Sequence, residues 1–326
     1  MTVANPERTG GFGSTRWWVK PGYEAVLETH HLDSLEALFQ VTGAELLSKP
    51  GLGQWRQRLR IQITLDGTPT PCYLKRFLNP PRPARREVRR ARTDRPVPTG
   101  LVPAGCDRPR SHAGLEWQWA ECLSRDGIFC IEPIAFGEEL RRNRERRSAI
   151  LTLGLPGDAL ERWMLMWKAR DAGLTDEGTR GPRVGGTPAA DGKLSVIRRV
   201  LVDVAAVVSR LHGCGYVHRD LYLSHIFFDP SSLTVPIRLI DLQRVIRPRF
   251  FLRRWIVKDL AALNFSTPSE LVTRTDRLRW IKQYLGVSKL DRDTKRLTLR
   301  VIGKTAAIAR HEARRKRALT GKAGGH

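Results

Sequence analysis

Two aspartates lie close together in one short stretch of the chain, and a pair of carboxylates of this kind is suited to phosphoryl transfer. The stretch from Tyr216 to Val245 reads YVHRDLYLSHIFFDPSSLTVPIRLIDLQRV, with Asp220 in a His-Arg-Asp triplet and Asp241 at the end of an apolar strand. In phosphoryl transfer, one carboxylate accepts the proton of the attacking hydroxyl, and another holds the metal ion that bridges the phosphates of ATP. We therefore take phosphoryl transfer as the first hypothesis for this stretch.

Lys75 and Glu116 lie on two earlier elements that the periodicity predicts. Apolar and polar residues alternate from Leu59 to Leu65, and Asp66-Gly67 then turns the chain into a second strand with Lys75, so we expect a β-hairpin. The segment GLEWQWAECLSRDG has helical periodicity and carries Glu116 beside its apolar stripe. Considered singly, Lys75 fits an exposed strand face, and Glu116 fits a first-turn glutamate stabilised by the helix dipole.

Gly51 and Gly53 form a small turn just before this hairpin. Glycines in such a turn let backbone amides approach a phosphate group. Two glycines without a third are also typical of an ordinary loop, so both interpretations stay open.

The composition indicates an anionic partner and a reducing compartment. The 326 residues include 57 Lys and Arg against 33 Asp and Glu, a net charge of +24, which suits nucleic acid, an anionic membrane leaflet or a phosphorylated glycolipid. Five cysteines without a CxxC pair argue against a disulfide framework and against a zinc site. The N-terminus lacks an apolar signal segment and no apolar run reaches the roughly 18 residues of a membrane span, so we expect a cytoplasmic protein, peripheral to the inner membrane at most.

The pattern changes from strands to helices at Gly154-Leu155-Pro156-Gly157, where we place a hinge between two lobes. We expect a partly ordered lead-in (1–32), an N-lobe (33–154), a helical C-lobe (155–303) and a basic C-terminal tail (304–326). The N-lobe begins with a helix that Asp33 and Glu36 cap as a capping box. A buried helix from Lys193 to His212 leads to the His-Arg-Asp triplet.

Two insertions interrupt the lobes, and one of them is strongly basic. Residues 79–114 are rich in proline and arginine and predict a solvated loop, with seven arginines against two acidic residues between Arg82 and Arg95. Residues 171–192 are rich in glycine and proline and predict a disordered insertion. Each basic side chain held near an anionic bilayer contributes about 1 kcal/mol, so the basic segments are candidates for membrane contact.

The motifs HRDLYLSHIFFD and LIDLQRV resemble those of the lipopolysaccharide core heptose kinases, the Kdo/WaaP-type family of the protein-kinase-like superfamily. The segments LEWQWAECLSRDGIFCIEPIAFGEE and RRWIVKDLAALNFST are similar to further elements of that family, and the resemblance runs from about Leu46 to Leu285. It implies an α+β, bilobal protein-kinase-like fold, with an antiparallel-sheet N-lobe and a mainly helical C-lobe.

The resemblance also implies roles for individual residues, with ATP and Mg²⁺ as cofactors. Asp220 is then the catalytic aspartate, Asp241 the magnesium ligand, Lys75 the lysine on the ATP phosphates and Glu116 its ion-pair partner. Gly51 and Gly53 would belong to the loop that covers the phosphates, in which Arg56 stands where kinases have a third glycine.

His225 has three possible roles. It stands where protein kinases use an asparagine for a second metal ion, although Mg²⁺ prefers oxygen ligands. The imidazole is therefore a candidate metal ligand, a phosphate contact or a group that orients Asp241.

The resemblance implies a kinase for a hydroxyl of a lipopolysaccharide core sugar, heptose-like, at the cytoplasmic membrane face. A protein kinase is the first alternative, but only 18 residues separate Asp241 from Asp259 and no Ala-Pro-Glu motif intervenes, which leaves little room for a peptide-binding segment. A catalytically inactive, basic kinase-fold binding protein is the second. Nucleic acid is disfavoured as a partner, because the basic tail has no aromatic side chains on which bases could stack.

Overall fold

The computed structural model describes residues 13–47, 53–91, 110–142, 144–171, 190–229 and 237–323. The chain divides into two compact units. Unit 1 comprises Met1–Leu155 together with Asp241–Val245, and unit 2 comprises Pro156–Ile240 together with Ile246–His326. The five residues that begin with Asp241 therefore belong to unit 1, although the sequence on either side of them belongs to unit 2.

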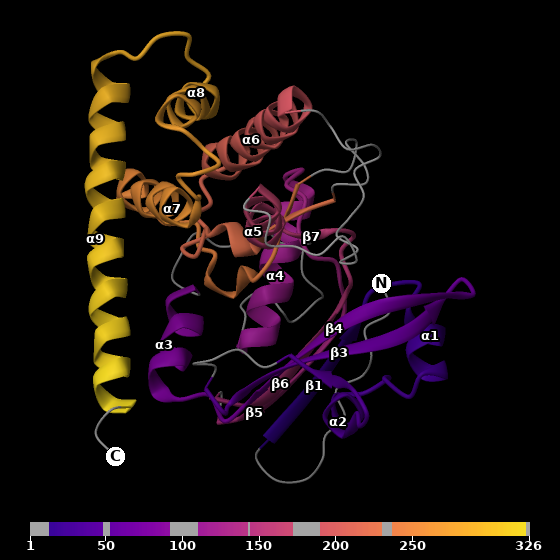
Figure 1. Ribbon diagram of the computed structural model, residues 1–326. Coiled ribbons are helices and arrows are strands. Elements are labelled where there is room, and N and C mark those ends of the chain that lie inside the picture. The colour runs from indigo at the N-terminus through magenta and orange to yellow at the C-terminus, as the bar shows by residue number, and fades with distance from the viewer. Residues whose placement is uncertain are drawn as a thin grey trace. The chain divides into compact units, whose positions relative to one another are not determined.

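Unit 1 is built on a six-stranded antiparallel sheet (Figure 1). Its strands lie in the order β1-β5-β6-β4-β3-β2. Their bounds are β1 Gly13–Val19, β2 Glu45–Leu46, β3 Arg56–Leu65, β4 Thr68–Leu78, β5 Pro133–Arg141 and β6 Arg144–Leu153. The predicted hairpin is confirmed as β3 and β4, which Asp66 and Gly67 join with φ angles of 49° and 72°. Positive φ at both turn residues matches the twist of the flanking strands, which favours Asp-Gly at this point.

Helices cover both faces of this sheet. On one face, α1 (Glu24–Thr29) and α2 (Leu35–Gln40) contribute Leu27 and Leu38 to a buried apolar cluster with Leu59 and Leu74 of the hairpin. On the other face lies α4 (His112–Arg125), the predicted helix that carries Glu116. Because β4 is covered on both sides, its side chains alternate between the two helical layers.

The predicted start of the N-lobe at residue 33, after a partly ordered lead-in, is wrong, because the sheet of unit 1 begins at Gly13. Residues 13–32 form β1, which pairs with β5 along its whole length, and α1. Trp18 stacks on Phe136 with ring centroids 4.2 Å apart, and Leu27 is fully buried. The segment is too short to show a clear period, and its order comes from these contacts with distant strands. Residues 1–12 lie outside the described residues.

The helix after Asp33 is present, but its predicted cap is wrong. Ser34 is the N-cap of α2, and its hydroxyl accepts a hydrogen bond from the amide of Ala37. Serine and aspartate are both good N-caps, so adjacent candidates compete and the sequence alone does not separate them.

The predicted basic loop 79–114 is wrong at both ends. Arg82–Ala91 forms helix α3, and α4 begins at His112. Arginine and alanine are good helix formers, and Pro83 sits in the first turn, where it is tolerated. Val88 is buried, which gives α3 an apolar anchor. Residues 92–109 lie outside the described residues.

Unit 2 combines a small antiparallel sheet with five long helices among the residues that the structure describes. The sheet has the order β7-β8-β9, with β7 Asp158–Ala159, β8 Ile226–Phe228 and β9 Arg238–Leu239. The helices are α5 Leu160–Asp171, α6 Ala190–Gly213, α7 Leu252–Ser266, α8 Arg274–Leu285 and α9 Arg292–Ala323 (Figure 1). The helix predicted before the His-Arg-Asp triplet is confirmed as α6, which buries Val200, Val204 and Val208.

α9 extends through the boundary that the sequence predicted at residue 304. It packs against α7, where Asn264 donates a hydrogen bond to the hydroxyl of Thr305 at 3.0 Å. Residues 304–323 therefore continue a helix that starts at Arg292, and the predicted separate tail is wrong for them. Of the predicted Gly- and Pro-rich insertion, residues 172–189 lie outside the described residues, and 190–192 begin α6.

None of the helices in the described part of the chain combines the length and the apolarity that a passage through a bilayer requires.

Candidate functional site

A row of side chains crosses the sheet of unit 1 on the face that α4 covers. The strand register pairs Arg58 with Lys75, Lys75 with Ile150, Ile150 with Phe136 and Phe136 with Trp18. Cross-strand partners point to the same face, so the row has three apolar members beside α4 and two cations at its β4-β3 end.

The two cations of this row alternate with two carboxylates. Lys75 Nζ lies 2.5 Å from Glu116 Oε1 and 3.5 Å from Asp241 Oδ1, and Arg58 Nη2 lies 3.0 Å from Asp241 Oδ2. The side chain of Glu116 is fully buried, and those of Lys75 and Asp241 are 15% and 14% exposed. Buried charges are stable only when they are paired, and this four-residue cluster has no net charge. The structure thus brings together three of the predicted site residues, Lys75, Glu116 and Asp241. Arg58, which was not predicted, completes the cluster.

The N-terminus of α4 is anchored to β6, which fixes the position of Glu116. Glu145 accepts hydrogen bonds from the amide of His112 and from the hydroxyl of Ser148, and lies 2.6 Å from His112 Nδ1. Ser111, the N-cap, accepts a hydrogen bond from the amide of Gly114. A carboxylate at this place accepts hydrogen bonds from amides that have no partner within the helix, and it suits the positive end of the helix dipole. Sequence reasoning missed Glu145, which stands in a basic run with no motif around it.

A second carboxylate, Glu138, is buried beside the same helix end. Burial raises the pKa of this group, while a hydrogen bond with Ser111 and the charge of Arg16 act in the opposite direction. The side chain therefore retains its proton to a higher pH than an exposed glutamate does.

Asp241 has a strained backbone. Its φ and ψ are 60° and 55°, in the left-handed region, directly before the 3₁₀ helix Leu242–Arg244. A non-glycine residue in this region costs about 1–3 kcal/mol, and such residues cluster at functional sites. The side-chain amide of Gln243 donates to Asp241 Oδ1 at 2.5 Å and, with the two cations, fixes the carboxylate.

A magnesium ion fits the donor chemistry of Asp241. Carboxylate oxygens are the ligands that Mg²⁺ prefers, and this ion commonly uses one or two carboxylates with phosphates and waters. Among the residues that the structure describes, no three His, Cys, Asp or Glu side chains gather as a dedicated metal site. Asp241 would hold the ion, which would supply positive charge to the phosphates.

Asp220 and His225 lie on one turn of unit 2. His225 Nδ1 lies 2.7 Å from the backbone oxygen of Asp220, so this nitrogen carries the proton and donates. The ring of His225 stacks on that of His218, and His218 Nε2 lies 3.0 Å from the backbone oxygen of Ile240. The amide of Ile240 in turn donates to the backbone oxygen of His225. The two imidazoles thus fasten the turn of Asp220 to the residue before Asp241. Magnesium ligation by His225 stays a prediction.

The turn of Asp220 is also held from α7. Asp259, which is 1% exposed, accepts hydrogen bonds from the amides of His218 and Arg219 at 2.6 and 2.7 Å. Ser266 at the end of the same helix accepts one from the amide of Leu223. Both residues lie in the segment RRWIVKDLAALNFST that carried part of the resemblance, but their contacts could not be read from it.

Only one of the two predicted loop glycines is described. Gly53 is exposed, and a Cβ atom there would lie 2.6 Å from the indole nitrogen of Trp55. Gly51 lies outside the described residues. Arg56 begins β3 and stacks over the ring of Trp55.

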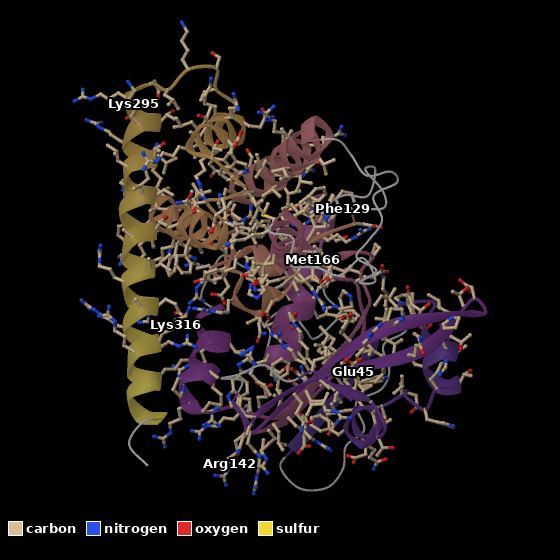
Figure 2. The ribbon with its side chains drawn as sticks, viewed as in Figure 1. Glu45, Phe129, Arg142, Met166, Lys295 and Lys316 are labelled. Atoms are coloured by element: carbon tan, nitrogen blue, oxygen red, sulfur yellow. The ribbon has the colours of Figure 1, made fainter. Side chains whose placement is uncertain are left out.

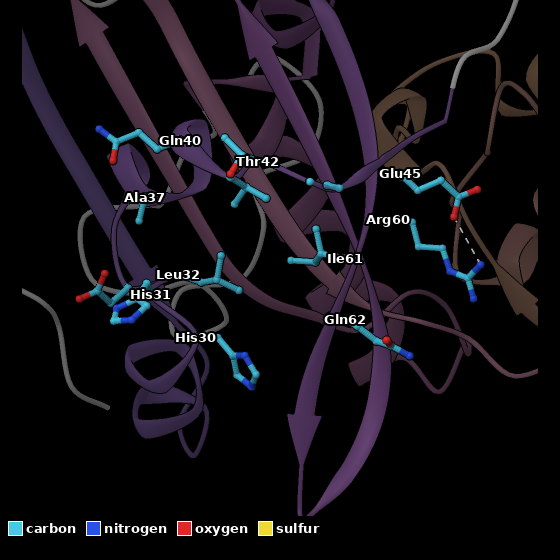
Figure 3. Close-up of a pocket in the computed structure, with 14 residues that line it drawn as sticks. His30, His31, Leu32, Ala37, Gln40, Thr42, Glu45, Arg60, Ile61 and Gln62 are labelled. Atoms are coloured by element: carbon cyan, nitrogen blue, oxygen red, sulfur yellow. Dashed lines mark ion pairs between the residues drawn. The ribbon is translucent and has the colours of Figure 1, made fainter.

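A cavity of about 860 Å³ in unit 1 lies apart from these residues (Figure 3). Its lining comes from the segments 30–33, 37, 40–45 and 60–62, and includes the ion pair Arg60–Glu45 at 3.6 Å. Lys75, Glu116 and Asp241 do not line it. This cavity is therefore not the candidate catalytic site.

Comparisons with known proteins agree with the resemblance seen in the motifs. Residues 189–284 match the model of the "Lipopolysaccharide kinase (Kdo/WaaP) family", a segment that contains Asp220, His225 and Asp241. The chain is 29% identical over 180 residues to "Lipopolysaccharide core heptose(I) kinase WaaP" of Escherichia coli strain K12, covering 54% of this chain and 60% of that protein. It is 30% identical over 178 residues to the protein of the same name from Pseudomonas aeruginosa, covering 53% and 59%.

The solved structure "WaaP in complex with acyl carrier protein" matches with a TM-score of 0.59 and 23% identity, covering 90% of this chain and 98% of that one. The predicted resemblance to the Kdo/WaaP family and the predicted α+β, protein-kinase-like fold are thus confirmed. The sequence matches span about 60% of the length of the curated relatives.

Proposed function

We propose, on the premise that the chain resembles the lipopolysaccharide kinase (Kdo/WaaP) family in sequence and fold, that it is an ATP- and Mg²⁺-dependent kinase. The acceptor in this proposal is a hydroxyl of a lipopolysaccharide core sugar, heptose-like. The observation that carries the proposal is Lys75, which contacts the buried carboxylate of Glu116 and the carboxylate of Asp241 at once. A fold that only binds a partner has no need of a lysine held between two carboxylates.

Each residue of the site has a role in the proposed reaction. Asp220 orients the sugar hydroxyl and accepts its proton. Lys75 binds the phosphates in the position that Glu116 gives it, and Asp241 holds the metal ion. His225 holds the turn of Asp220 through its Nδ1 hydrogen bond, and metal ligation through its other nitrogen belongs to the proposal. Gly51 and Gly53 cover the phosphates with their backbone amides.

The test is a phosphotransfer assay with radiolabelled ATP against delipidated core oligosaccharides, with a peptide mixture and free sugars as controls. We expect transfer to the oligosaccharide, and we expect Asp220→Asn to lower it about 10²-fold or more. Transfer to peptides alone would favour the protein kinase alternative. ATP turnover that Asp220→Asn leaves unchanged would contradict the role of Asp220.

We also propose that the chain contacts an anionic membrane peripherally, and the solvent-exposed side of α9 supports this. Leu299 and Ile302 are 67% and 55% exposed. Basic side chains surround them along the helix, and Figure 2 labels Lys295 near its first turns and Lys316 near its last. The exposed basic residues are Arg292, Lys295, Arg296, Arg300, Arg310, Arg314, Arg315, Lys316 and Arg317. An exposed helix face that is basic with apolar residues between is typical of peripheral contact with an anionic bilayer.

Vesicle co-sedimentation tests this contact. We expect binding to vesicles with anionic lipid, weaker binding to neutral vesicles, and loss of the difference when Arg310, Arg314 and Arg317 are changed to Gln. Equal binding of the wild-type chain to both vesicle types would refute peripheral attachment through charge.

The second alternative, a catalytically inactive binding protein, has its own test. Retention of the chain on DNA without any ATP turnover would favour it.

A further inference from the structure

Arg58 is the one member of the charged cluster in unit 1 to which no role has yet been assigned. It lies on β3 directly opposite Lys75 of β4, on the same face of the sheet. Its Nη2 atom lies 3.0 Å from Asp241 Oδ2, and its side chain is 25% exposed.

Packing does not explain an arginine at this position. Like charges directly opposite each other on neighbouring strands destabilise a sheet. The row that contains Arg58 and Lys75 continues with Ile150, Phe136 and Trp18, so an apolar residue at position 58 would extend the row without repulsion. The arginine is tolerated because the carboxylate of Asp241 contacts both cations.

Asp241 also links Arg58 to the nucleotide. A metal ion on the oxygens of Asp241 would compete with both cations for the same carboxylate. The guanidinium would then need another anion, and it is a rigid fork of donors that matches two phosphate oxygens at once. Lys75, its neighbour in the register, is already assigned to those phosphates.

We propose that Arg58 is a second phosphate-binding residue of the nucleotide site, which Asp241 holds in position when no nucleotide is bound. This inference rests on the proposed function, because it requires a nucleoside triphosphate at Lys75. Arg58 then binds the same anion as Lys75, from the neighbouring strand.

The competing interpretation is that Arg58 serves only to neutralise Asp241. A double-mutant cycle with Asp241→Asn separates the two, because this change removes the carboxylate that Arg58 neutralises. The measurement is the dissociation constant of a non-hydrolysable ATP analogue by calorimetry, in buffer with EDTA. No metal ion and no phosphotransfer enter this readout.

We expect Arg58→Gln to weaken binding of the analogue about tenfold in the Asp241→Asn background, as the loss of one charge-assisted hydrogen bond does. Binding of adenosine, which has no phosphates, should be unchanged. The matched control is Arg60→Gln, an arginine two residues along β3 that pairs with Glu45 and should leave both ligands unaffected.

An unchanged dissociation constant for the analogue in Arg58→Gln with Asp241→Asn would overturn the inference while leaving the proposed function intact. A wild-type chain that binds no nucleotide, with or without Mg²⁺, would overturn both. If the double variant does not fold, Arg58→Lys in the same background takes its place. It keeps the charge but loses the fork, and a loss of about threefold is expected, whereas no loss would again overturn the inference.

Discussion

Asp259 holds the backbone of Arg219 in a left-handed conformation. The φ angle of Arg219 is 70°, and its amide donates to Asp259 Oδ1 at 2.7 Å. Trp255, one turn earlier in α7, lies under the guanidinium at 5.5 Å from its ring centroid. Arg219 directly precedes Asp220. The same contacts therefore fix the backbone position from which the side chain of Asp220, the proposed catalytic residue, extends.

We predict that Asp259→Ala destabilises unit 2 by about 3–5 kcal/mol, because one buried and one partly buried backbone amide lose their acceptor. Asp259→Asn should destabilise unit 2 less than Asp259→Ala does, since the amide oxygen of asparagine still accepts one of the two hydrogen bonds. Thermal unfolding measures both, and phosphotransfer by the folded Asn variant should fall as well. Asp203→Ala, a half-buried aspartate on α6 that pairs only loosely with Arg199 at 3.7 Å, is the control and should unfold nearly like the wild type. Wild-type stability of Asp259→Ala would exclude this role.

We predict that Lys75→Met lowers phosphotransfer about 10²-fold or more, because it removes a positive charge from the phosphates. Glu116→Gln should lower it less. The two changes should not add, since Glu116 acts through Lys75. Stability should show the same coupling: Lys75→Met leaves Glu116 buried without its partner, and the double variant relieves this. A double variant that unfolds at a lower temperature than Lys75→Met would contradict the ion pair.

Glu138 predicts how the stability of unit 1 depends on pH. Its pKa is raised by burial, so the folded chain retains a proton that the unfolded chain releases near its ordinary pKa of 4.5. This contribution to stability is fully present below pH 4.5 and is lost as the pH rises through the folded pKa. Glu138→Gln should therefore raise the unfolding temperature more at pH 7 than at pH 4.

The control for this prediction is the neighbouring residue Glu139. Its side chain points to the other side of the strand and pairs with Arg147 at 2.6 Å. Glu139→Gln should not reproduce the larger rise of the unfolding temperature at pH 7 that is expected for Glu138→Gln. Identical pH profiles for Glu138→Gln and the wild type would rule out the buried carboxylate as its source.

Gly157, in the first turn of unit 2, has a backbone conformation and a close contact that only glycine accommodates without strain. Its φ is 84°, and a Cβ atom there would lie 2.2 Å from the backbone oxygen of Phe228. We predict that Gly157→Ala destabilises unit 2 by about 1–3 kcal/mol, because both the φ angle and the contact become unfavourable. Gly213→Ala, where a Cβ atom would meet nothing within 4 Å, should be neutral or stabilising. Equal unfolding temperatures for the two variants would contradict this.

The parts of the fold that could be predicted depend on local signals. The Asp66-Gly67 turn and the alternating apolar residues predict the β3-β4 hairpin, and the His-Arg-Asp triplet with the later Asp241 indicates phosphoryl transfer. β1 could not be predicted in this way, because it pairs with β5, more than a hundred residues away. The residues of α3 favour a helix, but the same proline- and arginine-rich composition also fits a solvated loop, and the burial of Val88 could not be read from the sequence.

The site shows the same division. Glu116 and Asp241 could be proposed because they lie in segments that resemble the family's, and Lys75 could be proposed because it lies on a predicted strand before them, in the order that kinases have. Arg58 and Glu145 have no motif, and their contacts follow from strand register and from the end of α4. The alternation of residues in β3 did contain a signal for Arg58. Neighbouring residues of a strand point to opposite faces, so Arg58 had to face away from the α1 and α2 layer that Leu59 contacts.

The register of the hairpin also limits which length changes this chain can accept. Successive residues of a strand point to opposite faces, so Lys75 reaches α4 only because a fixed number of residues separates it from the Asp66-Gly67 turn. Losing a single residue between Thr68 and Lys75 would turn the ammonium toward α2 and bring Arg76 to the position that now faces Glu116. Losing two would keep the face but slide the lysine along the strand. An odd-numbered deletion in this stretch is therefore incompatible with the proposed phosphate binding by Lys75, because it moves the side chain to the other face of the sheet.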